Sequence, residues 1–274
     1  MQDIRVAAVI SHCPIGKIRD NLNRMVDHIS VAKKNGVSVI CFPEMNITGY
    51  TIDPSIAYFA EFVPGQVTSN LSHLSRQHDI VIFAGMAEKQ KAGGVFASHL
   101  VAKPDGSLGV YRKLHIAPPE RDVYTAGSKV PLFEACGVRF GIQLCYDAHF
   151  PELTMRMALN GADIVFMPHA SPRGTPEDKF KSWMRHLPAR AYDNSIFIVA
   201  CNQTGENQGG LVFPGVALII GPSGNVLAKD TSGKESMLIA DLKADELSRV
   251  KSHPMRYFLP NRRPDISDLK VIEG

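Results

Sequence analysis

The chain of 274 residues is 45% hydrophobic and 21% charged, an ordinary globular composition that excludes a disordered protein. Its formal net charge of +3 is too small to favour a nucleic-acid partner, and no cluster of Lys and Arg with interleaved aromatics supports one. The longest apolar runs have the length of β-strands, so no membrane span is predicted. The first residues contain acidic Asp3 and no basic leader, and we expect a cytoplasmic protein.

Strands and helices alternate through the first half of the chain. Residues 18–36 carry apolar side chains at helical spacing, with Gly36 as a natural end, and residues 69–79 form a second expected helix. The run Pro104-Asp105-Gly106 is a strong turn signal between two neighbouring strands. The strands predicted in this half are residues 4–11, 37–44, 80–86, 95–106 and 108–115.

The second half repeats the alternation. The predicted strands are residues 131–137, 138–147, 162–168, 195–202 and 235–242, with a hairpin over 216–229, and the predicted helices are residues 151–161, 179–194 and 243–251. Pro188 lies inside the second of these helices and should kink or divide it. This pattern predicts an α/β protein with two sheets and helices outside them. No break in composition marks a linker, so we expect one domain over residues 1–274.

Cysteines and histidines do not follow the spacing of a disulfide framework or a metal site. The five cysteines are odd in number and widely spaced, and no C-x-x-C or H-E-x-x-H run occurs. The sequence also lacks the glycine-rich motifs of nucleotide-binding loops and the G-x-S-x-G run of serine hydrolases. We therefore expect no metal and no cofactor.

Three reactive side chains stand at the ends of predicted strands: Glu44, Lys113 and Cys145. In α/β folds the carboxyl ends of the strands are where ligands bind and where side chains converge. Each residue alone has an ordinary explanation, as a solvated glutamate, a surface lysine and a core cysteine. Together they provide a base, an ammonium group and a thiol nucleophile, which is a sensible set for acyl transfer.

Asp147 and His149 also suggest a Cys-His-Asp arrangement with Cys145. Because catalytic partners in such triads usually come from distant segments, and His149 is very close to Cys145 in the chain, we expect both residues to be structural. They would hold the turn by hydrogen bonds, with Asp147 tolerating the backbone bend. We expect a similar structural role for His115.

Three longer segments carry the reactive residues: FPEMNITGY, YRKLHIAPPE and CYDAHFPE. They resemble the glutamate, lysine and cysteine motifs of the nitrilase superfamily of carbon–nitrogen hydrolases. The segment LPARAYDNSIFIVACN and the terminal RRP also match runs usual in that family, so the resemblance extends nearly from end to end. A slight departure is Ile116, where leucine is commoner. The resemblance implies a four-layer α-β-β-α sandwich with two mixed sheets.

The resemblance implies a role for each reactive residue. Cys145 would attack a carbonyl or nitrile carbon, and Glu44 would take the thiol proton, pass it to the departing amine and later activate water. Lys113 would stabilise the oxyanion together with the backbone N–H of Tyr146. No metal is needed, since the thiol, the carboxylate and the ammonium group supply nucleophile, base and electrophile.

Glu120 matches a second glutamate of the family. It is expected to position Lys113 or the leaving amine of the substrate. An ion pair with Arg121 or Arg112 is the alternative, and the sequence does not decide between them.

The loop MPHASPRGTPEDKF follows a predicted strand end and should line the mouth of the pocket. Its polar candidates for substrate binding are His169, Ser171 and Arg173. One hypothesis is that Arg173 binds a substrate carboxylate as a bidentate fork. An ion pair with Glu177 or Asp178 explains the arginine equally well.

These expectations define a hydrolase acting on a small linear amide or N-carbamoyl amine through a Cys thioester, with release of ammonia. Nitrile hydrolysis by the same triad is the alternative within the class, and a non-catalytic binding or scaffold protein of the same fold is the alternative outside it. A thiol-based redox protein is disfavoured, since no resolving cysteine stands at motif spacing.

The resemblance also implies at least a homodimer, joined through helices beside the active site into an eight-layer core. The tail, residues 252–274, is rich in proline and arginine and has little periodicity, so it must pack along the surface, cross to a partner or stay mobile. We expect the part with Arg262, Arg263 and Pro264 to reach across to the partner subunit.

Overall fold

The computed structural model describes residues 1–268 and contains two mixed sheets. The strands of the first sheet, in spatial order, are β13 (Ser236–Leu242), β1 (Ile4–His12), β2 (Val39–Cys41), β3 (Val81–Lys89), β4 (Val95–Ala102) and β5 (Leu108–Arg112). Strands β1, β2 and β3 are parallel, whereas β13, β4 and β5 pair antiparallel with their neighbours.

The second sheet repeats this arrangement. Its strands, in spatial order, are β12 (Val226–Asp230), β11 (Ala217–Ile220), β9 (Phe197–Glu206), β8 (Ile164–His169), β7 (Val138–Ile142) and β6 (Phe133–Ala135). Strands β7, β8 and β9 are parallel and the outer strands antiparallel. A short parallel pairing of β1 with β9 joins the two sheets, and β10 (Val212–Pro214), which the sequence did not predict, pairs with the end of β9.

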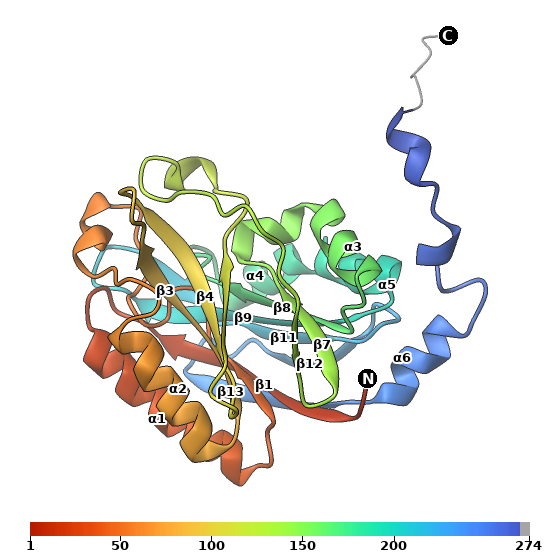
Figure 1. Cartoon of the computed structure of the whole chain (residues 1–274), viewed down its shortest axis with the longest axis horizontal. Helices are drawn as coiled ribbons and strands as arrows, with labels where there is room; N and C mark the ends of the chain where they lie inside the picture. Colours follow the sequence, from red (N-terminus) through yellow and green to blue (C-terminus); the bar gives the residue numbers. More distant parts are fainter. Residues whose placement is uncertain (269–274) are drawn as a thin grey trace.

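Helices cover the outer faces of both sheets (Figure 1). The helices are α1 (Ile18–Lys34) and α2 (Gln66–His78) on the first sheet, α3 (Pro151–Leu159), α4 (Pro176–Trp183) and α5 (Leu187–Asn194) on the second, and α6 (Ala244–Lys251) after β13. Short 3-10 helices are η1 (Pro54–Tyr58), η2 (Pro118–Glu120), η3 (Cys145–His149), η4 (Leu259–Asn261) and η5 (Pro264–Asp268). The expected four-layer α-β-β-α sandwich is thereby confirmed.

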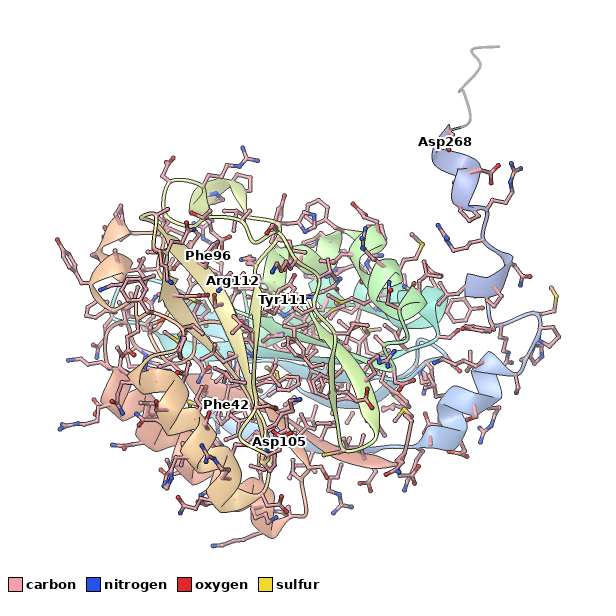
Figure 2. All side chains as sticks on the ribbon, viewed as in Figure 1. Phe42, Phe96, Asp105, Tyr111, Arg112 and Asp268 are labelled. Atoms are coloured by element: carbon pink, nitrogen blue, oxygen red, sulfur yellow. The ribbon has the colours of Figure 1, made fainter. Side chains whose placement is uncertain are left out.

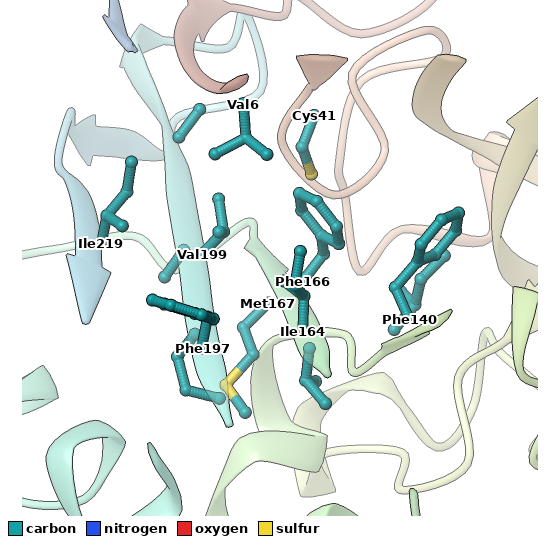
Figure 3. Close-up of a cluster of buried hydrophobic side chains, with 14 of the residues drawn as sticks. Val6, Cys41, Phe140, Ile164, Phe166, Met167, Phe197, Val199 and Ile219 are labelled. Carbon is teal, nitrogen blue, oxygen red and sulfur yellow. The ribbon is translucent and has the colours of Figure 1, made fainter. Parts of the chain in front are cut away.

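Alternating side chains of β1 divide the apolar interior into two layers. Val6 and Ile10 belong to the core between the sheets, whereas Val9 packs with the buried face of α1. Across the inner layer the Phe83 ring of the first sheet meets the Phe166 ring of the second, with centroids 4.5 Å apart. Figure 3 shows this inner layer, where Phe166 lies among apolar side chains of several strands. Side chains fill the space between the ribbons of the two sheets (Figure 2).

Several predicted boundaries move in the structure. The predicted helix 179–194 is divided into α4 and α5, and Pro188 is the second residue of α5, where its missing N–H costs little. Helix α2 begins at Gln66 rather than at residue 69, and Thr68 bonds the backbone of Gly65 at its start. Among residues 1–268, no helix combines the length and the apolar character that crossing a membrane requires.

The tail leaves the body after α6 and extends away from it (Figure 1). The Phe258 ring packs at a tilt against Tyr192 of α5, with ring centroids 5.4 Å apart, and Leu259 is buried. Residues 269–274 lie outside the described residues, and the packing of the tail on a partner stays a prediction.

Candidate active site

The structure brings Glu44, Lys113 and Cys145 together just beyond the ends of β2, β5 and β7. The Lys113 ammonium is buried, with its Nζ 2.9 Å from Glu44 Oε1 and 2.9 Å from Glu120 Oε1. Both carboxylates are also buried. A buried ammonium held between two carboxylates is fixed in position, because loss of either partner would leave an unpaired charge.

Both carboxylate oxygens of Glu120 accept hydrogen bonds besides the contact with Lys113. Its Oε1 accepts the Tyr50 hydroxyl at 2.8 Å, and its Oε2 accepts the Ala117 N–H at 2.9 Å. Within residues 1–268 no ion pair joins Glu120 to an arginine, so the alternative pairing with Arg121 or Arg112 is wrong.

Arg112 instead pairs with Glu88. Its Nε donates to Glu88 Oε2 at 2.7 Å, and its guanidinium lies 4.9 Å from the centre of the Phe96 ring (Figure 2). Arg112 and Lys113 are neighbours in the chain, but Arg112 pairs with Glu88 whereas Lys113 pairs with Glu44 and Glu120.

Glu44 has the environment of a general base. Its Oε2 accepts the Ala170 N–H at 2.9 Å, and its backbone carbonyl accepts Gln203 Nε2 at 2.8 Å. Burial raises the pKa of Glu44 above its usual value, and the Lys113 ammonium opposes this rise. A raised pKa makes the carboxylate a better proton acceptor near neutral pH.

Cys145 occupies a strained turn between β7 and η3. Its φ of +44° lies in the left-handed region, which residues other than glycine rarely adopt. The sequence prediction placed the tolerated bend at Asp147, and this is wrong, because the left-handed residue is the cysteine itself. The side chain of Cys145 is half-buried, so it is held by the turn and still partly accessible.

The thiol of Cys145 is neutral in this environment. Burial raises its pKa to about 12, with Glu44 and Glu120 raising it and Lys113 and Lys179 lowering it. Burial would lower the pKa of Lys113, but the negative charges of Glu44 and Glu120 and the hydrogen bond to Glu120 oppose burial, and the pKa is raised. Lys113 thus stays charged while the thiol needs a base to become a nucleophile.

Asp147 holds the turn by hydrogen bonds, as the sequence predicted. Its carboxylate accepts the Tyr111 hydroxyl at 2.7 Å and the Leu144 N–H at 3.0 Å (Figure 2 labels Tyr111 on β5). His115 adds its backbone N–H and its Nδ1, each 2.8 Å from Asp147 Oδ1. These bonds tie the cysteine turn to the segment that carries Lys113.

His149 contributes ring contacts rather than the expected hydrogen bonds. Its ring centroid lies 4.5 Å from that of His186 and 5.7 Å from that of Tyr146. Within residues 1–268 its side chain has no hydrogen-bond partner. The Cys-His-Asp arrangement gains no support from this geometry.

The residues predicted to bind substrate occupy three different environments. His169 is buried, with its Nδ1 2.7 Å from the Met167 carbonyl oxygen and its ring against Trp183. Ser171 is partly buried, and its backbone N–H and carbonyl both bond to the Asn202 side chain. Arg173 is exposed.

Neither expected ion pair of Arg173 forms. Glu177 pairs with Lys181, and Asp178 Oδ2 accepts the Thr175 hydroxyl at 2.7 Å. Substrate binding by His169, Ser171 and Arg173 stays a prediction.

Sequence reasoning missed Lys179 and Tyr50. Lys179 Nζ lies 2.6 Å from Ser171 Oγ, beside the candidate nucleophile whose pKa it lowers. The capping signal of Thr175 followed three residues later by Asp178 would have started this helix at Pro176 and placed Lys179 in its first turns. Tyr50 lies inside the glutamate motif but was not considered separately.

No three side chains of His, Cys, Asp or Glu gather as a metal site would require, in the part of the chain that the structure describes.

Comparison with known proteins assigns the family. The family model for carbon–nitrogen hydrolase matches residues 5–252. The chain therefore belongs to the carbon–nitrogen hydrolase family, and its resemblance to the nitrilase superfamily is confirmed.

Curated relatives cover nearly the whole chain at low identity. A probable nitrilase of Schizosaccharomyces pombe is 29% identical over 91% of this chain and 92% of its own length. An (R)-stereoselective amidase of Pseudomonas is 28% identical over 84% of this chain and 82% of its own length. The omega-amidase of Homo sapiens is 26% identical over 93% and 92%.

Solved structures agree in fold. A carbon–nitrogen hydrolase of Helicobacter pylori superposes with a TM-score of 0.85 at 25% identity, covering 97% of each chain. A mutant amidase of Nesterenkonia in complex with butyramide gives a TM-score of 0.79 at 26% identity, covering 90% of this chain and 93% of that one. The named relatives include both amidases and nitrilases, so the comparisons define a hydrolase of carbon–nitrogen bonds without a single substrate.

Proposed function

We propose that the protein hydrolyses a carbon–nitrogen bond in a small linear amide or N-carbamoyl amine and releases ammonia. The observation that carries this proposal is the buried Lys113 ammonium between Glu44 and Glu120, beside a thiol on a strained turn. Amidases among the relatives support the amide as the first substrate class.

For an amide the proposed reaction has two stages. Cys145 Sγ attacks the carbonyl carbon while Glu44 takes the thiol proton, and the resulting oxyanion is stabilised by Lys113 Nζ and the Tyr146 N–H. Glu44 then returns the proton to the nitrogen, so that ammonia leaves and a thioester remains. A water molecule that gives its proton to Glu44 attacks the thioester, and the carboxylic acid and free thiol are released.

A nitrile is the second candidate substrate, because relatives named nitrilase match this chain. The same thiol would add to the nitrile carbon. The products distinguish an amidase from a nitrilase, since a nitrilase gives a carboxylate from a nitrile and accepts no matching amide.

The test is ammonia release from a panel of small amides, N-carbamoyl amines and nitriles, with Cys145→Ala run in parallel. We expect turnover of at least one amide or carbamoyl compound, and its loss by roughly 10⁴-fold or more in the variant. Absence of turnover, together with no preferred alkylation of Cys145 by iodoacetamide, would instead favour a binding or scaffold protein.

We further infer at least a homodimer, on the resemblance to the family. Helices α3 and α5 and the start of the tail line a groove of about 370 Å³ whose walls include Met155, Phe258 and Leu259. Tyr192 on α5 is 43% exposed and Phe258 39%. Exposed apolar surface of this kind supports an interface beside the candidate active site.

A further inference from the structure

The start of α4 holds a partly buried ammonium group that has no carboxylate partner. Lys179 Nζ lies 2.6 Å from Ser171 Oγ and 3.2 Å from the Pro172 carbonyl oxygen, both neutral groups. Within residues 1–268, no carboxylate lies within ion-pair distance of it. The nearby acids of the same helix are engaged elsewhere, Glu177 with Lys181 and Asp178 with Thr175.

The residues that hydrogen-bond Lys179 and Glu44 are neighbours in the chain. Ser171, which holds the ammonium, directly follows Ala170, whose N–H donates to Glu44 Oε2 at 2.9 Å. Adjacent Cα atoms are about 3.8 Å apart, so the two hydrogen bonds belong to one short stretch of backbone. That stretch is fixed, since the Ser171 N–H and carbonyl are each 2.9 Å from the Asn202 side chain.

The charge of Lys179 also acts on the candidate nucleophile. Burial lowers the pKa of Lys179, and negative charge on Cys145 raises it. Because the thiol is neutral at rest, no anionic side chain among residues 1–268 lies within ion-pair distance of the Lys179 ammonium. A partly buried cation without a counter-ion is unfavourable, and a bound carboxylate would relieve this cost.

We propose that Lys179 is a specificity-determining residue that binds a carboxylate of the substrate, so that the protein prefers acidic amides or N-carbamoyl amino acids over neutral ones. This inference rests on the proposed function and names the substrate class of the same site. It moves the carboxylate role from Arg173 to Lys179, because Arg173 is exposed whereas Lys179 is held beside the candidate catalytic residues.

The first test compares two amides of equal carbon number, succinamate and butyramide, which differ in a carboxylate and a methyl group. In Lys179→Met we expect kcat/KM for succinamate to fall about 10- to 100-fold more than kcat/KM for butyramide, the range for a lost hydrogen bond to a charged group. Any effect of the lost charge on Cys145 should be common to both amides. Lys181→Met is the matched control, since Lys181 lies on the same helix but is exposed and pairs with Glu177. Thermal melting checks that each variant is folded.

The second test needs no turnover. Iodoacetate and iodoacetamide both alkylate thiols and differ mainly in charge. The ratio of their alkylation rates at Cys145 therefore reports the electrostatic potential near the thiol. We expect Lys179→Met to lower the iodoacetate-to-iodoacetamide ratio about 10-fold, and Lys181→Met to leave it unchanged.

The two tests separate this inference from the proposed function. If no amide is turned over but the alkylation ratio depends on Lys179, the anion site stands and the proposed function fails. If amides are hydrolysed but wild type shows no preference for succinamate, or Lys179→Met impairs both amides equally, the anion site is refuted while the proposed function stands. An alkylation ratio unchanged in Lys179→Met also refutes the anion site.

Discussion

At the scale of single residues, backbone strain and charge act together on Cys145. A non-glycine residue in the left-handed region costs on the order of 1–3 kcal/mol, and such strain persists only where the surroundings impose it. Here the Asp147 carboxylate binds the Leu144 N–H, the residue before the cysteine. This bond helps to hold the thiol on a strained turn, and in the proposed mechanism Glu44 removes its proton only when a substrate is attacked.

The proposed role of Glu44 as a base predicts a specific pH profile. Below its pKa Glu44 carries a proton and cannot accept one from the thiol, so kcat/KM should fall as the pH falls. Because burial raises this pKa, the acid limb should lie above about pH 4.3, the ordinary value for glutamate. Glu44→Gln keeps the shape and should lower kcat about 10²- to 10⁴-fold.

The measurement is kcat/KM against pH for wild type and Glu44→Gln, with Glu134→Gln as control because the Glu134 side chain is 69% exposed. The residual activity of Glu44→Gln should lack the acid limb. If the limb persists unchanged, another group titrates there.

The sequence predicted the residues of the candidate site that follow the end of a strand, and missed Lys179, which does not. Glu44, Lys113 and Cys145 follow strand ends, so topology alone suggested that they meet. Lys179 could not be found in this way, because it lies in a helix that begins at Pro176 rather than at a strand end. Its ammonium group reaches back to the Ser171 hydroxyl. The left-handed turn at Cys145 also left no sign in residue type, since glycine is the usual marker.

At the scale of elements, the sequence predicted which strands and helices exist better than it predicted where each begins and ends. The strand expected within residues 37–44, ended by Pro43, is shorter in the structure, where β2 is Val39–Cys41. Pro43 has no N–H for a ladder, and the chain turns at Met45, whose φ is +58°. Strand β10 was missed because its short run ends in a proline and is flanked by glycines, which read as a loop.

The contact of Phe166 with Phe83 of the opposite sheet predicts that truncating Phe166 greatly lowers the free energy of unfolding. Phe166 is fully buried and lies 4.5 Å from Phe83 of the opposite sheet, measured between ring centroids (Figure 3). Phe166→Ala leaves a cavity between two sheets that cannot easily close, and should lower the free energy of unfolding by about 3–5 kcal/mol.

Chemical denaturation measures this loss. Phe62→Ala makes the same change at a side chain of a residue that is 51% exposed and should cost less than about 1 kcal/mol. Equal losses in the two variants would show that the inner layer does not carry the stability assigned to it.

At the scale of the whole molecule, the candidate site needs both sheets. Glu44 and Lys113 follow strands of the first sheet, Cys145 follows a strand of the second, and the short pairing of β1 with β9 joins the two. Periodicity predicted most of these strands but not their order, since pairing between distant strands leaves no local pattern. The layer order came instead from the resemblance of three motifs to a known family.

The proposed dimer gives the last prediction at this scale. Sedimentation at micromolar concentration should show a particle of at least twice the 30.0 kDa chain mass. Tyr192→Asp places a charge on the exposed face of α5, beside Phe258 of the tail, and burying that charge in an interface would be costly, so this variant should sediment as a monomer. Tyr58→Asp is the control, because Tyr58 is 86% exposed on η1, outside the groove of α3 and α5, and should leave the dimer intact. A wild-type monomer would contradict the dimer, and a Tyr192→Asp dimer would move the interface to another face.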